Sequence, residues 1–168
     1  MIIDLVNVVP RPIAVETVYD ASEIDLDSED ARLISNAQFQ GETERVGGKA
    51  HLRGTIDSQV QTTCSRCLET VDQGLAITFD DVFVDRSNQE IDLELSEELL
   101  DESIVENGLI DLKEVVREQI LLALPEHPLC KEECRGLCPK CGENRNLISC
   151  RCEENEMDPR WSALKDII

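Results

Sequence analysis

Aromatic side chains are nearly missing from this sequence, which has one tryptophan, one tyrosine and three phenylalanines among 168 residues. The apolar fraction is nevertheless 41%, enough for the core of one domain of ordinary size. The core must therefore consist mainly of aliphatic side chains. A bound metal ion or a covalent cross-link would be a useful support for such a core.

Basic residues are also scarce. Sixteen lysines and arginines face 36 aspartates and glutamates, which gives a formal net charge of −20. A surface of this charge repels phosphate backbones at long range, which argues against a general nucleic-acid-binding protein and suits a basic protein partner better. The same charge is also consistent with a simple role in solubility.

No apolar stretch is long enough to span a membrane. The N-terminal "MIIDLVNVVPRP" carries Asp4 inside its apolar run, ends at Pro10 and has no basic segment before it, so it does not read as a signal peptide. We therefore expect a cytoplasmic protein without a membrane partner, in which thiols stay reduced.

Groups typical of catalysis are few. His51 and His127 are the only histidines, no glycine-rich phosphate loop is present, and no nucleophile–base pair follows from residue spacing. We expect no enzymatic activity, no catalytic residues and no small-molecule substrate.

Alternating polar and apolar residues predict an antiparallel meander. One strand is expected from Ala31 to Phe39 and a second from Ala50 to Thr62, with a hairpin turn at Gly47-Gly48. The same parity continues to Cys64, so "CSRC" is expected to form the turn into a third strand around residues 75–79. Weaker patterns predict strands at 13–19 and around 91–95, the latter inside the acidic segment 85–106.

One helix is predicted near residues 111–124. Asp111 is a good N-cap, Glu114 completes a capping box, and Pro125 ends the helix. Leu121, Leu122 and Leu124 are expected to widen its buried face. A short second helix is predicted at the C-terminus, beginning at Asp158 and docking through Trp161.

The predicted fold class is therefore α+β: an antiparallel, open or barrel-like β-sheet with one packed helix and a Cys-rich zinc-binding C-terminal tail. Residues 1–128 form the β-rich body in this prediction. Residues 129–168 form the tail and its short helix, which docks on the body to give a single domain.

Eight cysteines are the strongest signal in the chain. Zinc prefers four ligands in a tetrahedron, and thiolates meet that preference. "CPKCG" is typical of a zinc knuckle, and the Cys-x-Cys pair eight residues later completes a local set. The remaining four cysteines converge if the helix lies across the meander and its exit reaches the "CSRC" tip. The predicted ligands of two Zn²⁺ ions are Cys64, Cys67, Cys130 and Cys134 (site 1) and Cys138, Cys141, Cys150 and Cys152 (site 2).

Other uses of these thiols stay open at this point. One zinc ion with spare cysteines, an iron–sulfur cluster, or a redox dithiol at Cys64 and Cys67 would each employ some of them. An RNA-processing enzyme with a bound metal is a further alternative.

The cysteine-rich stretch 129–152 is the one part of the chain that leans basic, with five cations against three glutamates. Its cations could compensate the thiolate charge or contact RNA. The candidate RNA contacts are Arg135, Lys140, Arg145 and Arg151.

Taken together, "TCSRCLE", "DLKEVVREQILLALPEHPLCKEECRGLCPKCGENRN" and the ending "DPRWSALKDI" resemble the YceD family, the large ribosomal RNA subunit accumulation proteins. The resemblance covers roughly Gly48 to Ile168. It implies a bacterial or plastid, non-enzymatic ribosome-biogenesis factor that is needed for large-subunit ribosomal RNA to accumulate. It also implies a partner such as a basic large-subunit ribosomal protein, an assembly intermediate or precursor rRNA. The charge of −20 departs from what extensive rRNA contact would require.

Overall fold

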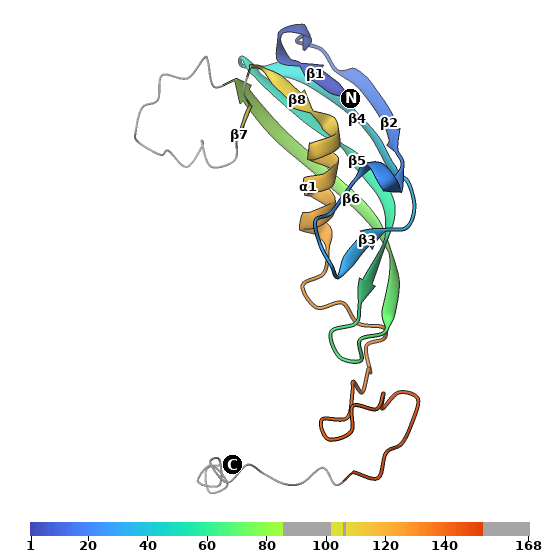
Figure 1. The fold of residues 1–168 in the computed structure, drawn as a ribbon. Coiled ribbons are helices and arrows are strands. Elements are labelled where there is room, and N and C mark those ends of the chain that lie inside the picture. Colours follow the sequence, from blue (N-terminus) through green and yellow to red (C-terminus); the bar gives the residue numbers. More distant parts are fainter. Residues whose placement is uncertain (86–101, 106, 153–168) are drawn as a thin grey trace, which may run out of the picture.

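The computed structural model describes residues 1–85, 102–105 and 107–152 (Figure 1). The strand predicted around 91–95 and the C-terminal helix with Trp161 lie outside these residues. Within the described ranges, the elements in chain order are β1 (Ile2–Asp4), η1 (Leu5–Asn7), β2 (Ile13–Tyr19), η2 (Ala21–Glu23), β3 (Ala31–Leu33), β4 (Ala37–Val46), β5 (Lys49–Thr63), β6 (Thr70–Asp85), β7 (Glu102–Val105), β8 (Leu109–Asp111) and α1 (Leu112–Ala123).

The main sheet is built around β5. Its strand order is β2-β4-β5-β6-β7, and β3 pairs with β5 beside β4. Most pairs are antiparallel, but β6 and β7 run parallel. A separate two-stranded sheet joins β1 to β8. The structure is thus α+β as predicted. The prediction of a purely antiparallel sheet was wrong, because β6 and β7 pair in parallel, and of the two predicted forms the sheet takes the open one rather than the barrel.

The two longest strands follow the predicted alternation. β5 buries Leu52, Ile56 and Val60 completely, and Ser58 is buried in the same row, whereas the alternate residues Arg53, Thr55, Asp57 and Gln59 are exposed. The hairpin from β4 to β5 turns at Gly47 and Gly48, whose φ angles of +59° and +88° are those of a type I′ turn. The predicted hairpin and its register are therefore confirmed.

The strand predicted at 31–39 is divided between the short strand β3 and the beginning of the ten-residue strand β4. The Ser35 hydroxyl accepts a hydrogen bond of 2.8 Å from the Gln59 amide, and the Ile34 amide donates to the Gln59 carbonyl. The serine side chain thus takes the place of a ladder partner at this point. β3 therefore ends at Leu33, and β4 begins at Ala37 with the same inward parity.

Helix α1 lies across one face of the sheet (Figure 1). It buries Leu112, Val115, Val116 and Ile120, and the Asp111 carboxylate caps its first turn by accepting from the Lys113 amide. Leu121 and Leu124 pack partly against the core as predicted. The prediction that Leu122 is buried was wrong, since its side chain is 79% exposed. Leu122 lies about 200° around the helix from the buried Ile120 and therefore faces away from the core.

Two of the three buried phenylalanines of the sheet meet over a pair of glycines. The rings of Phe39 and Phe79 lie 5.9 Å apart. Gly41 and Gly54 face each other across β4 and β5, and a Cβ on Gly54 would approach the Phe39 ring to 2.7 Å. The absence of Cβ atoms on these two glycines therefore leaves room for the Phe39 ring.

Candidate metal centres

The β5–β6 hairpin ends in a tight turn formed by "CSRCL". Cys64 ends the inward-facing row of β5 and is completely buried. Its amide donates to the Glu69 carbonyl at 2.8 Å, and its carbonyl accepts from the Leu68 amide at 3.0 Å. Leu68 has a φ of +62°, a left-handed conformation that normally favours glycine. This turn brings the Cys64 and Cys67 side chains to the same side of the hairpin tip.

The tail reaches this tip directly after helix α1. The Ser65 amide donates to the Pro128 carbonyl, and the Leu137 amide donates to the Arg66 carbonyl. The Arg66 guanidinium donates in turn to the Cys134 carbonyl at 3.1 Å. Gly136 is needed here, because it has a φ of +68° and a Cβ on it would lie 2.9 Å from the Arg66 carbonyl oxygen. These contacts hold the tail against the turn.

The result is a cluster of four sulfurs from two segments that are far apart in the sequence. The Sγ atoms of Cys64, Cys67, Cys130 and Cys134 all lie within 4.8 Å of one another. The Cys64–Cys134 and Cys67–Cys130 pairs are 3.9 Å and 3.6 Å apart. Four ligands at about 2.3 Å from a tetrahedral zinc ion would be about 3.8 Å apart. The donor set and its spacing therefore fit a zinc ion.

A second cluster lies farther along the tail. The Sγ atoms of Cys138, Cys141, Cys150 and Cys152 also lie within 4.8 Å of one another. The Gly142 amide donates to the Cys138 carbonyl at 2.9 Å, the same hydrogen bond that Leu68 makes in the first turn. Gly142 has a φ of +76°. Both clusters are thus built on one turn type, although one of the turns has leucine where the other has glycine.

The two clusters differ in exposure and in what they join. Three of the four cysteines in the first cluster are buried, and Cys130 is exposed. In the second cluster only Cys138 is buried, and Cys141 is exposed. The first cluster connects the tail to the hairpin of the sheet. The second connects only segments of the tail to one another.

Asn146 is a residue of the site that the sequence analysis missed. Its side-chain amide donates to the Cys134 sulfur at 3.2 Å, and its side-chain carbonyl accepts from the Arg135 amide at 2.9 Å. The Asn144 side chain also accepts two hydrogen bonds from Asn146. Because Asn146 lies on the loop that leads to Cys150, it links the second cluster to a ligand of the first. The two asparagines in "ENRN", next to a cysteine pair, were the available signal.

One thiol in each cluster is placed to lose its proton first. Burial raises the pKa of Cys64, but hydrogen bonds from the amides of Arg66, Cys130 and Cys67 outweigh it and lower the pKa to about 6. Hydrogen bonds from the Cys141 and Lys140 amides likewise lower the pKa of Cys138 to about 6.

One thiol in each cluster has a strongly raised pKa. Burial, together with the neighbouring thiols, raises the pKa of Cys130 to about 12. The pKa of Cys152 is raised to about 12 by its hydrogen bond with Cys141 and by burial. A divalent cation would displace these remaining protons, since thiolates are the form that binds metal.

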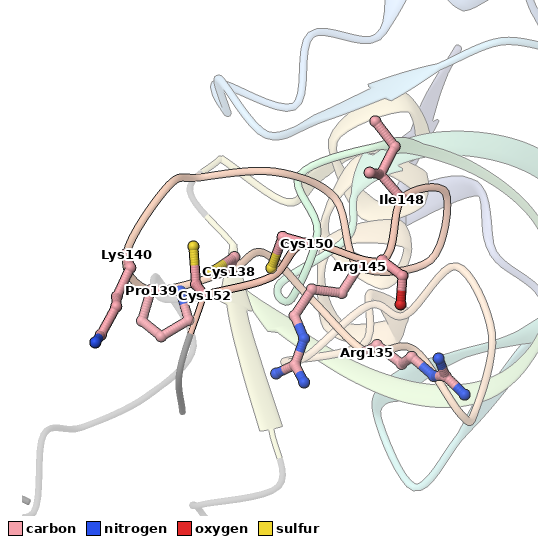
Figure 2. A pocket seen from close by; sticks show the side chains of 9 residues that line it. Arg135, Cys138, Pro139, Lys140, Arg145, Ile148, Cys150 and Cys152 are labelled. Atoms are coloured by element: carbon pink, nitrogen blue, oxygen red, sulfur yellow. The ribbon is translucent and has the colours of Figure 1, made fainter. Parts of the chain in front are cut away.

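A pocket of about 410 Å³ opens beside the second cluster. Figure 2 shows Cys138, Cys150 and Cys152 gathered between the side chains of Lys140 and Arg145. Of the four predicted RNA contacts, Arg135, Lys140 and Arg145 line this pocket, whereas Arg151 is exposed outside it. Neither histidine belongs to either cluster. Within the described part of the chain, no helix combines the length and hydropathy that crossing a membrane requires.

Comparison with known proteins points in one direction. Residues 52–168 match the family described as "Large ribosomal RNA subunit accumulation protein YceD". The chain is 29% identical over 154 residues to uncharacterized protein YlbN of Bacillus subtilis, covering 91% of this chain and 86% of that protein. It is 28% identical over 126 residues to uncharacterized protein Rv2926c of Mycobacterium tuberculosis, covering 74% of this chain and 58% of the relative.

A plant protein also matches, over a shorter stretch. The chloroplastic large ribosomal RNA subunit accumulation protein YCED homolog 1 of Arabidopsis thaliana is 31% identical over 58 residues, which are 34% of this chain and 18% of that protein. No solved structure matches the chain.

Proposed function

The chain belongs to the YceD family, and from that membership we propose that it is a non-enzymatic ribosome-biogenesis factor. In this proposal it is needed for the RNA of the large ribosomal subunit to accumulate. The name of the plant relative supports the same process. Two structural zinc ions hold the protein in its working shape.

The observation that carries the structural role is the composition of the two clusters. Each supplies four cysteine sulfurs within 4.8 Å of one another. A catalytic zinc site keeps one coordination position open for water or substrate, whereas four protein ligands close the site. Site 1 is held by Cys64, Cys67, Cys130 and Cys134, and site 2 by Cys138, Cys141, Cys150 and Cys152. In both, bound zinc supplies a cross-link between chain segments.

The same cluster argues against a redox dithiol at Cys64 and Cys67. Each of these sulfurs is paired at 3.9 Å or less with a sulfur from the tail. In the zinc-loaded protein neither thiol is free to form a disulfide with the other. Alkylation of the metal-loaded protein tests this directly: the proposal expects no rapid labelling of Cys64 or Cys67.

The distribution of charge suggests which partner binds to which part of the protein. The net charge of −20 favours a basic large-subunit ribosomal protein, or an assembly intermediate that carries one, on the acidic body. The cations that line the pocket favour precursor rRNA on the tail. Small-molecule substrates have no part in this proposal.

Depletion in the native organism tests the proposal. We expect the ratio of large-subunit to small-subunit rRNA to fall on depletion and to recover with the wild-type gene. A Cys64→Ser, Cys130→Ser variant should fail to restore it, whereas Arg11→Gln, which alters an exposed cation before β2, should restore it fully. An unchanged rRNA ratio after complete depletion would refute the function. Elemental analysis of the purified protein should find two zinc ions per chain.

A further inference from the structure

The pocket beside the second cluster combines cations with an apolar wall. Arg135, Lys140 and Arg145 contribute the charge, and Pro139 and Ile148 contribute apolar surface. Figure 2 shows the Arg145 side chain beside the cysteines, with Lys140 on one side of the cluster and Arg135 on the other. Its volume of about 410 Å³ lies within the range of natural ligand pockets.

The formal charges at the pocket sum to about +1 with metal bound. A zinc ion with four thiolates carries a net charge of about −2, and the three cationic side chains that line the pocket contribute +3. Among the described residues, no carboxylate lies within ion-pair distance of Arg135 or Lys140. Both side chains are exposed. An anionic ligand could therefore pair with Arg135 and Lys140 without breaking an ion pair to a described carboxylate.

We propose that this pocket binds the phosphate backbone of a short single-stranded segment of RNA. This inference rests on the proposed function, because it names the part of the protein that contacts the RNA. Guanidinium and ammonium groups are the usual partners of phosphate oxygens, and a guanidinium plane beside apolar side chains also accepts an unstacked base.

The negative charge of the body favours a single-stranded segment over a duplex. A duplex is rigid and carries phosphates on all sides, so docking one on the tail would bring its other strand toward a chain of net charge −20. A flexible single strand can place a few phosphates in the pocket and direct the rest away. Binding through three cations to phosphates alone predicts little sequence preference.

The second metal ion is part of this site. Three cysteines of the second cluster also line the pocket: Cys138, Cys150 and Cys152. A metal ion bound by the cluster would therefore fix the position of this pocket wall. Cys141 belongs to the cluster but does not line the pocket. A substitution of Cys141 therefore tests the metal without removing a pocket side chain.

Binding of a labelled oligouridine to the full-length, zinc-loaded protein tests the inference by fluorescence anisotropy at several salt concentrations. Three phosphate contacts predict a slope of log affinity against log salt of about −2 for a single strand. Arg135→Gln and Lys140→Gln should each reduce this slope by about 0.7 and weaken binding several-fold at low salt. Arg11→Gln changes the net charge equally, at the end of the sheet opposite the hairpin tip, and should leave the slope unchanged. Cys141→Ser should lose one metal ion, and its RNA binding should weaken by the same factor as that of the pocket variants.

Four results would overturn the inference. They are equal binding of an RNA duplex of the same length, equal competition by polyglutamate, RNA affinity indistinguishable between the pocket variants and Arg11→Gln, and pocket variants that lower only metal retention. The last result would assign the cations to compensation of thiolate charge. If depletion lowers large-subunit rRNA but the pocket variants restore it and bind RNA normally, the inference fails while the proposed function stands.

Discussion

Removing one exposed ligand from each sulfur cluster should have unequal effects on the stability of the fold. Cys130 and Cys141 are the exposed cysteines of their clusters, so replacing either sulfur by the oxygen of serine removes little packing. Each variant should lose one zinc ion. Only Cys130→Ser should strongly destabilise the β-sheet, because only site 1 connects the tail to it.

The magnitude follows from the loops that the metals close. Site 1 joins Cys67 to Cys130, which are 63 residues apart and enclose β6, β7, β8 and α1. A cross-link over a loop of that length contributes about 4 kcal/mol by restricting the unfolded chain. Site 2 joins Cys141 to Cys150 and closes a loop of about nine residues, worth about 2.6 kcal/mol. That loop lies wholly in the tail, so its closure does not bear on unfolding of the sheet.

Denaturation followed by the far-UV circular dichroism of the sheet measures the difference, with metal content determined by native mass spectrometry. For a chain of this size, about 4 kcal/mol corresponds to a fall in Tm of about 8–16 °C for Cys130→Ser. Cys141→Ser should stay within about 1 kcal/mol of wild type. The reasoning is refuted if Cys130→Ser loses its metal yet keeps the wild-type Tm, or if Cys141→Ser destabilises the sheet as much.

Three further changes test other parts of the structure. Gly54→Ala should destabilise the fold by about 1–3 kcal/mol in urea unfolding, because its Cβ would meet the Phe39 ring and the facing backbone; Gly74→Ala, where a Cβ meets nothing within 4 Å, is the control. Asn146→Ala should weaken zinc retention at site 1 by about 10–100-fold in chelator competition, because Cys134 loses a hydrogen bond; exposed Asn36→Ala should have no effect. Burial raises the pKa of Asp81, partly offset by its hydrogen bond from Gln119. The stability contributed by protonated Asp81 is therefore fully present below its unfolded pKa and lost as pH rises through its folded pKa. Asp81→Asn should then stabilise the protein at neutral pH and not near pH 3, whereas exposed Asp57→Asn should do neither. An equal loss in both glycine variants, unchanged zinc retention, or a pH-independent effect of Asp81→Asn would each contradict the corresponding argument.

Local patterns predicted those elements whose structure is decided locally. The alternation from Ala50 to Thr62, the Gly47-Gly48 turn and the helix cap at Asp111 each rest on residues within one element, and all three are confirmed. Carrying the parity of β5 one step further correctly placed Cys64 on the buried side.

Features decided by pairing between distant segments could not be predicted in the same way. The parallel contact of β7 with β6 and the open edges of the sheet depend on the path of the chain between strands. The division of β3 from β4 depends on a hydrogen bond between Ser35 and Gln59, which alternation alone does not reveal. The prediction for Leu122 failed for a simpler reason, since three neighbouring leucines cannot share one helix face.

The extent of the hydrophobic core gives a reason for the metal site that we propose at the hairpin tip. Cys64, Cys67 and Cys134 form a small buried cluster of their own, separate from the main core, with Val71, Leu129 and Leu137 packed partly against it. No aromatic side chain occurs between residues 129 and 152, so this second cluster has no large apolar group to bury. Three partly buried aliphatic side chains are too few to order residues 129–152 of the tail. A zinc cross-link between Cys67 and Cys130 would add about 4 kcal/mol by restricting the unfolded chain. In the proposed function, the scarcity of aromatic residues and the abundance of cysteines are therefore connected: beyond the aliphatic core, the four cysteines and their metal ion hold the tail to the hairpin.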